Sequence, residues 1–292
     1  MARLGLSAES LRTPNPRLIY CAVSGFGQTG PLTQRASYDQ IIQGYCGLMS
    51  LTGDADTAPM KAGLVVCDTT AAITAAFAIA ASLVRRNATG EGETIDVSML
   101  ASSVGSITAW TVSNYLNAGN VPKPIGNHSQ TSAPSGTFRT GDGPLNIVNN
   151  EQKQFAATCD ALGLPELKTD LRFAERDDRM KNQKLLQEIM EAHLAGDTAA
   201  AWEAKLIAQG VPAGPVYTVP QIAEHAQLRE RGQLQTVHVP ALGRDVQVVG
   251  AGYKLGGKAL PITAPPPELG EHTGEVLAAG GVLGRGDCRT AG

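Results

Sequence analysis

The chain has 292 residues, of which 42% are hydrophobic and 17% are charged, and its formal net charge is −3. This length predicts one large domain, or one domain with a smaller insertion. The mild charge of mixed sign forms no basic stripe, so we expect neither nucleic acid nor an anionic membrane as a partner. The five cysteines are odd in number and have no CxxC spacing, which predicts reduced thiols.

The N-terminal half alternates between strand and helix patterns. RLIYCAVS, residues 17–24, predicts a strand that the glycines of GFGQTGP stop, and residues 38–51 have helical spacing of apolar residues. An alanine-rich segment follows and closes at Gly90, and TIDVSML then predicts a strand that enters another helix. The order strand, helix, strand predicts an α/β fold with a parallel sheet.

The alanine-rich segment is the most apolar part of the chain. From Ala71 to Val84 it is interrupted by Thr74 and Ser82, so we predict a helix packed in the core and no run as long as a membrane span. The beginning, MARLGLSAES, lacks the apolar core of a signal peptide, which predicts a cytoplasmic location.

The remaining residues predict a smaller mixed domain and a C-terminal segment. A polar linker, KPIGNHSQTSAPSGTF, leads into the strand LNIVNN and an amphipathic helix that ends at Gly163. Further elements are predicted as helices at 182–194 and 198–209, strands at 235–240 and 245–249, and a helical tail that starts at His272.

One carboxylate precedes the alanine-rich helix in GLVVCDTTAAITAAFAIA. Asp68 is a natural N-cap, and that structural role is the commoner one for an acid at this place. The same position favours an ionised carboxylate, which is the form that attacks an acyl group. These residues alone leave both interpretations open.

Other candidate sites are weaker. The loop GFGQTGP is neither a P-loop nor a dinucleotide motif, and it is equally a ligand-approaching loop or an ordinary strand exit. His128 lies in a polar loop, where a solvated histidine is the usual case. We find no metal-ligand spacing and no GxSxG motif, so we expect no metal site.

Several motifs together resemble the class III coenzyme A transferases, the formyl-CoA and carnitine type. These are YCAVSGFGQTGPLTQRASYDQIIQGYCGLMSLTG, the acid of GLVVCD, TGEGETIDVSML, the GTF…DG stretch, QKQFAATCDALGLPEL, FAERDDRMKN, GVPAGPVYT and LGEHTGEVL. They occur in the family's order over essentially the whole chain. The resemblance implies an enzyme whose substrates are an acyl-CoA thioester and a carboxylic acid, with no permanently bound cofactor.

The resemblance also implies roles for individual residues. Asp68 matches the catalytic aspartate, which forms an aspartyl–acyl anhydride and then an aspartyl-CoA thioester. Tyr38 matches a tyrosine near the thioester. Arg3 matches a basic residue that binds the CoA phosphates, and arginine suits phosphate because of its charge and its forked donors. Gly25 and Gln28, in the glycine loop, are further CoA-binding or substrate-binding candidates. Lys61 and His128 are candidates for the free carboxylate of a substrate, and a solvated surface role is equally open for Lys61.

Two other functions stay in consideration. The α-methylacyl-CoA racemases resemble the chain around both sites but place a histidine base where Tyr38 stands, and a tyrosine is a poor general base at neutral pH. The transferase is therefore favoured, with a dicarboxylate such as succinate or glutarate as acceptor. An inactive CoA-binding or assembly protein is the non-enzymatic alternative.

The resemblance implies a domain plan and an assembly. It predicts a Rossmann-like large domain at 1–120 that carries the aspartate, a small α+β domain with linker at 121–220, and a segment at 221–292 that returns to the large domain. Family subunits interlock as a homodimer. They also begin with a strand–helix segment that supplies part of the CoA pocket and an active-site glutamine, and we expect this sequence to start after that segment.

Overall fold

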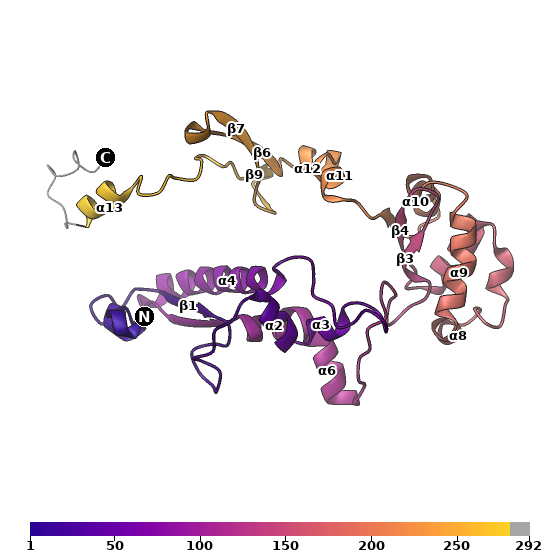
Figure 1. The fold of residues 1–292 in the computed structure, drawn as a ribbon, viewed down its shortest axis with the longest axis horizontal. Coiled ribbons are helices and arrows are strands. Elements are labelled where there is room, and N and C mark those ends of the chain that lie inside the picture. Colours follow the sequence, from indigo (N-terminus) through magenta and orange to yellow (C-terminus); the bar gives the residue numbers. More distant parts are fainter. Residues whose placement is uncertain (281–292) are drawn as a thin grey trace. The chain divides into compact units, whose positions relative to one another are not determined.

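The computed structural model describes residues 1–280, which belong to two compact units, Met1–Pro215 and Val216–Gly292 (Figure 1). The described residues contain one parallel pair of strands and three antiparallel sheets, so the fold is mixed α/β, as predicted in its coarse form. The described cysteines, Cys21, Cys46, Cys67 and Cys159, carry free thiols. Cys288 lies outside the described residues.

The parallel pair consists of β1 (Tyr20–Ser24) and β2 (Thr94–Ser98), with Ser24 opposite Ser98. The helices between them in sequence are α2 (Asp39–Tyr45), α3 (Leu48–Leu51) and α4 (Val66–Thr89). The predicted helix at 38–51 is thus two short helices, because Gly47 adopts a left-handed φ of 83° between them. α4 contacts both strands and lies beside β1 in Figure 1.

A first hydrophobic core joins α2, α4 and β2 to the helices that follow. These helices are α5 (Met99–Ser103), the π-helical turn η2 (Val104–Thr108) and α6 (Ala109–Ala118). The side chain of Ser98 caps α5 by accepting a hydrogen bond from the N–H of Ala101. The buried apolar residues of this core are Ile42, Cys46, Cys67, Ala71, Ala75, Val97 and Met99.

The prediction that the alanine-rich helix is packed in the core is wrong for most of its length. α4 forms because alanine is the best helix former, and it ends at Gly90 with a left-handed φ of 82°. Only its first turns contribute buried residues, whereas Phe77 is 76% exposed and Val84 72% exposed. By length and composition, α4 is also the one helix within the described residues that could cross a membrane, contrary to our expectation of none.

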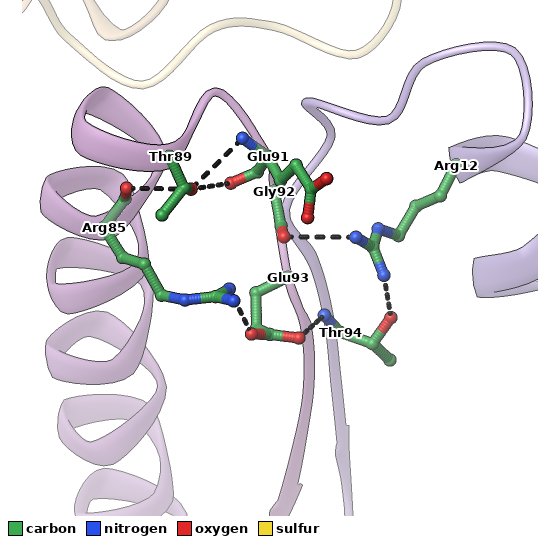
Figure 2. Close-up of polar contacts among 7 residues, drawn as sticks. All are labelled: Arg12, Arg85, Thr89, Glu91, Gly92, Glu93 and Thr94. Carbon is green, nitrogen blue, oxygen red and sulfur yellow. Dashed lines mark hydrogen bonds and ion pairs between the residues drawn. The ribbon is translucent and has the colours of Figure 1, made fainter.

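Polar contacts fix the amino end of the parallel pair, where α4 ends and β2 begins (Figure 2). Arg12, at the end of α1 (Ala8–Arg12), donates hydrogen bonds to the carbonyl oxygen of Gly92 and the hydroxyl of Thr94, both over 3.1 Å. Arg85 of α4 forms an ion pair of 2.5 Å with Glu93. The short helix η1 (Ala2–Leu4) precedes α1.

A second core consists of buried residues between Phe138 and Val211 and is separate from the first. Its antiparallel sheet has the order β3 (Ser135–Arg139), β4 (Pro144–Val148), β5 (Ala213–Pro215). The helices are α7 (Gln152–Leu162), η3 (Pro165–Lys168), α8 (Arg176–Lys181), α9 (Gln183–Leu194) and α10 (Ala199–Ala208). The strand at LNIVNN, the helix that ends at Gly163 and the next two long helices are as predicted.

The described part of the second unit, residues 216–280, is built from short elements. They are α11 (Val219–Ala223), α12 (Ala226–Glu230), β6 (Leu234–Val239), η4 (Pro240–Leu242), β7 (Arg244–Val249), β8 (Lys254–Leu255), β9 (Lys258–Ala259) and α13 (Thr273–Ala279). β6 and β7 form an antiparallel hairpin at the two predicted strands. The predicted helical tail is α13, and His272 is its N-cap residue.

Arg179 is a buried cation that organises the second core. It is 3% exposed, and its guanidinium donates hydrogen bonds to the carbonyl oxygens of Ala133, Phe173 and Ala174 and to the side chain of Gln152, over 2.7–2.9 Å. Burial lowers the pKa of this guanidinium from its ordinary value. The hydrogen bonds offset the cost of burying the charge. They connect α8 to Ala133, before β3, and to Phe173 and Ala174, before α8 itself.

Arg179→Lys is expected to reduce the free energy of unfolding by about 2–3 kcal/mol, because an ammonium cannot satisfy four separated acceptors. The matched control is Arg172→Lys, which weakens the exposed ion pair with Asp170 and is expected to cost about 0–1 kcal/mol. Urea unfolding monitored by circular dichroism measures both. Equal losses in the two variants would contradict the organising role of Arg179.

Candidate active site

Asp68 lies in the first turn of α4 and its side chain is exposed. The prediction that Asp68 is the N-cap is wrong, since the helix begins at Val66 and the N-cap residue is Val65, which makes no side-chain cap. An acid in the first turn still interacts favourably with the helix dipole. The side chain of Asp68 therefore lies near the positive end of the helix dipole, although it does not cap the helix.

The cap comes from α2. One carboxylate oxygen of Asp39, Oδ2, accepts hydrogen bonds from the N–H groups of Cys67 over 2.8 Å and Asp68 over 3.2 Å. This satisfies two of the N–H groups that a helix start leaves without partners. A residue distant in sequence thus fixes the main chain of Asp68.

Gln43, also on α2, extends the same network to the loop before α4. Its side-chain amide donates to Asp39 Oδ1 and to the carbonyl oxygen of Leu64 over 3.1 Å, and it accepts from the N–H of Ala62 over 2.9 Å. Lys61 precedes Ala62, and its exposed ammonium donates to the Ala62 carbonyl oxygen over 3.3 Å. Gln43 therefore holds the main chain next to Lys61, Asp39 holds that of Asp68, and these two α2 side chains bond to each other.

Tyr38 is the N-cap residue of α2 and is 82% exposed. It directly precedes Asp39, whose carboxylate bonds to the N–H of Asp68. The structure thus brings the segments that carry Tyr38, Lys61 and Asp68 to one place, which is near the carboxyl end of the parallel strands. A phenol, an ammonium and a carboxylate are available there to solvent.

The glycine loop after β1 adjoins this group. The Gly25 carbonyl oxygen accepts from the N–H of Leu100 over 3.0 Å, and a Cβ at Gly25 would lie 2.6 Å from the Cβ of Ser37, next to Tyr38. The close approach therefore requires glycine. The main-chain N–H of Gln28 donates to Asp96, and its side chain donates to Ser24 over 3.2 Å.

The structure does not join Arg3 and His128 to this group. Arg3 lies in η1, near the start of β1, where the hydroxyl of Tyr20 donates to the carbonyl oxygen of Leu6. That is the opposite end of the strand from the Asp68 region. His128 lies in the linker and pairs through its main chain with Gly136. The ligand roles of both residues stay predictions.

Cys67 is the other potential nucleophile at the start of α4. It is fully buried, and burial raises the pKa of its thiol to about 11. Because the thiolate is the reactive form, this cysteine is inert at neutral pH. Among the described residues no group of three or more His, Cys, Asp or Glu side chains is arranged to hold a metal ion.

Asp39 and Gln43 were not among the site residues predicted from the sequence. Their spacing of four residues on a helix allows a side-chain pair, which was the available signal in SYDQIIQ. Nothing in that local pattern indicates a bond to the N–H groups of Cys67 and Asp68, because this contact exists only once α2 and α4 are packed.

Comparisons with known proteins show similarity to CoA-transferases. A family model described as CoA-transferase family III matches residues 1–273. Succinyl-CoA:glutarate CoA-transferase of Mus musculus is 33% identical over 95% of this chain and 63% of that protein. Acetyl-CoA:oxalate CoA-transferase of Acetobacter aceti is 38% identical over 80% of this chain and 60% of that protein.

A solved structure is also similar. The crystal structure of a CAIB/BAIF family protein from Brucella suis matches with a TM-score of 0.81 and 34% identity, over 95% of this chain and 72% of that one. The chain spans less than two thirds of the length of the mouse and Acetobacter proteins.

The buried state of Cys67 predicts its reactivity. With iodoacetamide at pH 8, Cys21, which is half-buried, is expected to be alkylated at least about tenfold faster than Cys67, whose thiol stays protonated and covered. In urea the two rates should become similar. Peptide mass mapping measures both. Rapid alkylation of Cys67 in the folded chain would contradict this and would make Cys67 a competing nucleophile.

Proposed function

The chain belongs to CoA-transferase family III, as its motifs indicate, and from this membership we propose that it transfers coenzyme A from an acyl-CoA thioester to a carboxylic acid, with Asp68 as the nucleophile. The observation that carries the proposal is the position of Asp68: an exposed carboxylate in the first turn of α4, whose main chain Asp39 holds. The inert thiol of Cys67 leaves Asp68 as the available nucleophile at this helix start.

The proposed reaction has two symmetrical halves. The Asp68 carboxylate attacks the thioester carbonyl, which forms a mixed anhydride and releases CoA thiolate. The thiolate attacks the aspartyl carbonyl, which forms an aspartyl-CoA thioester and releases the donor acid. The acceptor carboxylate then attacks this thioester to form a second anhydride, and the returning thiolate forms the new acyl-CoA and restores Asp68.

We assign the surrounding residues by their chemistry. Tyr38 is a hydroxyl donor for the thioester oxygen, and Lys61 is a cation for the free carboxylate of a substrate. Gly25 permits the close packing of the glycine loop against the segment before Tyr38, and Gln28 is a further donor on that loop.

Two predicted ligands, Arg3 and His128, form no side-chain hydrogen bond with this group among the described residues. Arg3 is proposed to bind the CoA phosphates and His128 a substrate carboxylate, and both assignments rest on the family resemblance.

The acceptor is proposed to be a dicarboxylate such as succinate or glutarate. The name of the mouse relative, succinyl-CoA:glutarate CoA-transferase, supports this choice, and the name of the Acetobacter aceti relative makes oxalate the competing acceptor. The linker around NHSQTSAP lacks the glycine run typical of the formyl-CoA enzymes, which favours the longer acids.

We also propose the finer architecture expected from the family. It comprises a Rossmann-like large domain at 1–120, a small α+β domain at 121–220, a segment at 221–292 that returns to the large domain, and a homodimer. The parallel β1–β2 pair with α4 beside it, the separate antiparallel sheet β3–β4–β5 and the exposed apolar face of α4 support this plan. No permanently bound cofactor is proposed, and a cytoplasmic location stays a prediction.

Asp68→Asn is expected to lower CoA transfer from succinyl-CoA to glutarate at least about a thousandfold, because an amide cannot form the anhydride. Folding should change little, since Asp39 rather than Asp68 caps α4. The matched control is Asp177→Asn, another exposed acid in the first turn of a helix, which should keep full activity. Product acyl-CoA is measured by liquid chromatography with succinate, glutarate, oxalate and acetate as acceptors.

Two results would contradict the proposal. Transfer retained by Asp68→Asn would exclude Asp68 as the nucleophile. Absence of transfer by the wild-type chain from succinyl-CoA or acetyl-CoA to every acceptor would exclude the activity itself. Equal rates with acetate and the dicarboxylates would contradict only the choice of acceptor.

A further inference from the structure

Asp39 is an unusual carboxylate because it is buried without a cation. It is 7% exposed, and within residues 1–280 it forms no ion pair. A buried charge without hydrogen bonds is costly. Here the two carboxylate oxygens accept hydrogen bonds from the side-chain amide of Gln43 and from two main-chain N–H groups at the positive end of the α4 dipole.

The two carboxylate oxygens of Asp39 have different partners. Oδ2 accepts both main-chain N–H groups, those of Cys67 and Asp68, and Oδ1 accepts the Gln43 amide. Gln43 is 1% exposed and is itself bonded to Ala62 and Leu64. Gln43 therefore orients the Asp39 carboxylate, and Gln43 is itself held by hydrogen bonds from its amide nitrogen and to its amide oxygen.

This arrangement joins three separate segments: the start of α2, the loop before α4 and the start of α4. Tyr38 directly precedes Asp39, and Asp68 is one of the two residues whose N–H groups it accepts. The side chain of Asp39 thus links the residue next to Tyr38 directly to the main chain of Asp68. Misplacement of a reacting group by about 1 Å can cost about a hundredfold in rate.

We propose that Asp39, oriented by Gln43, is a positioning residue for the transfer reaction, because it fixes the position of the proposed nucleophile Asp68 relative to Tyr38. Asp39 acts through the main chain of Asp68 and does not touch the substrate. The inference rests on the proposed role of Asp68 as the nucleophile. The competing interpretation is a helix cap that contributes to stability alone.

The test compares three variants of the 292-residue chain. Asp39→Ala removes both acceptors, and Asp39→Asn keeps one oxygen that can still accept the Cys67 and Asp68 N–H groups. The control is Thr108→Val, which removes another buried hydrogen bond, from the Thr108 hydroxyl to the Cys46 carbonyl oxygen, and leaves the Asp39 and Gln43 side chains unchanged. Thermal unfolding gives the stability lost in each.

Steady-state transfer from succinyl-CoA to glutarate separates positioning from stability. For Asp39→Ala we expect kcat to fall about tenfold to a hundredfold, with KM for succinyl-CoA changed less than about threefold. Asp39→Asn should regain at least part of the lost kcat. Thr108→Val should keep kcat within about threefold of the wild-type value at a temperature where the variants are folded. This should hold even if its melting temperature falls as much as that of Asp39→Ala.

Two kinetic results would overturn the proposal. A kcat for Asp39→Ala equal to that of Thr108→Val at matched folded fraction would leave only a stability role. A rise in KM with unchanged kcat would make Asp39 a binding determinant instead.

Amide hydrogen exchange keeps this inference distinct from the proposed function. Peptides that cover residues 66–70 should exchange faster in Asp39→Ala than in wild type, with peptides of the second core unchanged. If the wild-type chain transfers no CoA, the proposed function fails, and faster exchange confined to this turn still supports control of the Asp68 main chain by Asp39. Unchanged exchange at residues 66–70 would overturn that control whatever the activity.

Discussion

The hydrogen bonds from the start of α4 to the Asp39 carboxylate are the contact on which the candidate site depends. They join Asp39 to Cys67 and Asp68, which lie 28 and 29 positions later in the sequence. They satisfy N–H groups that the helix itself cannot pair. Because Gln43 anchors the same carboxylate to the loop before α4, one buried pair on α2 determines where the helix begins. The residues assigned to chemistry, Asp68, Tyr38 and Lys61, are exposed around this buried support.

Because the cap comes from α2, the side chain of Asp68, the proposed nucleophile, stays accessible. A carboxylate that also capped the helix would have its oxygens occupied by main-chain N–H groups. Since Asp39 provides the cap, the side chain of Asp68 is exposed to solvent and near the positive end of the helix dipole. The neighbouring thiol of Cys67 is buried and its pKa is raised to about 11, so we propose the carboxylate as the reactive group.

Much of the fold was predictable from local patterns. The helix that ends at Gly163 and the strands β1 and β2 follow from apolar spacing and glycine punctuation. The cap of α4 was not predictable, because a local rule assigns it to Asp68, whereas the acceptor belongs to α2. The prediction that α4 is buried was also wrong. Alanine content predicts a helix, but only packed neighbours decide which of its faces are covered, and Phe77 is exposed here. The proposal that Asp68 is a nucleophile came from the family resemblance and not from residue spacing.

The central claim is that Asp68 carries CoA covalently, and chemical trapping tests it most directly. The chain is incubated with succinyl-CoA, treated with borohydride and mapped by peptide mass spectrometry. Reduction of an aspartyl-CoA thioester releases CoA thiol and converts the side chain to an alcohol, a loss of one oxygen and a gain of two hydrogens. We predict this change at Asp68 and its absence at Asp177. The same change at another acid, or acylation of Cys67 with Asp68 unmodified, would contradict the account.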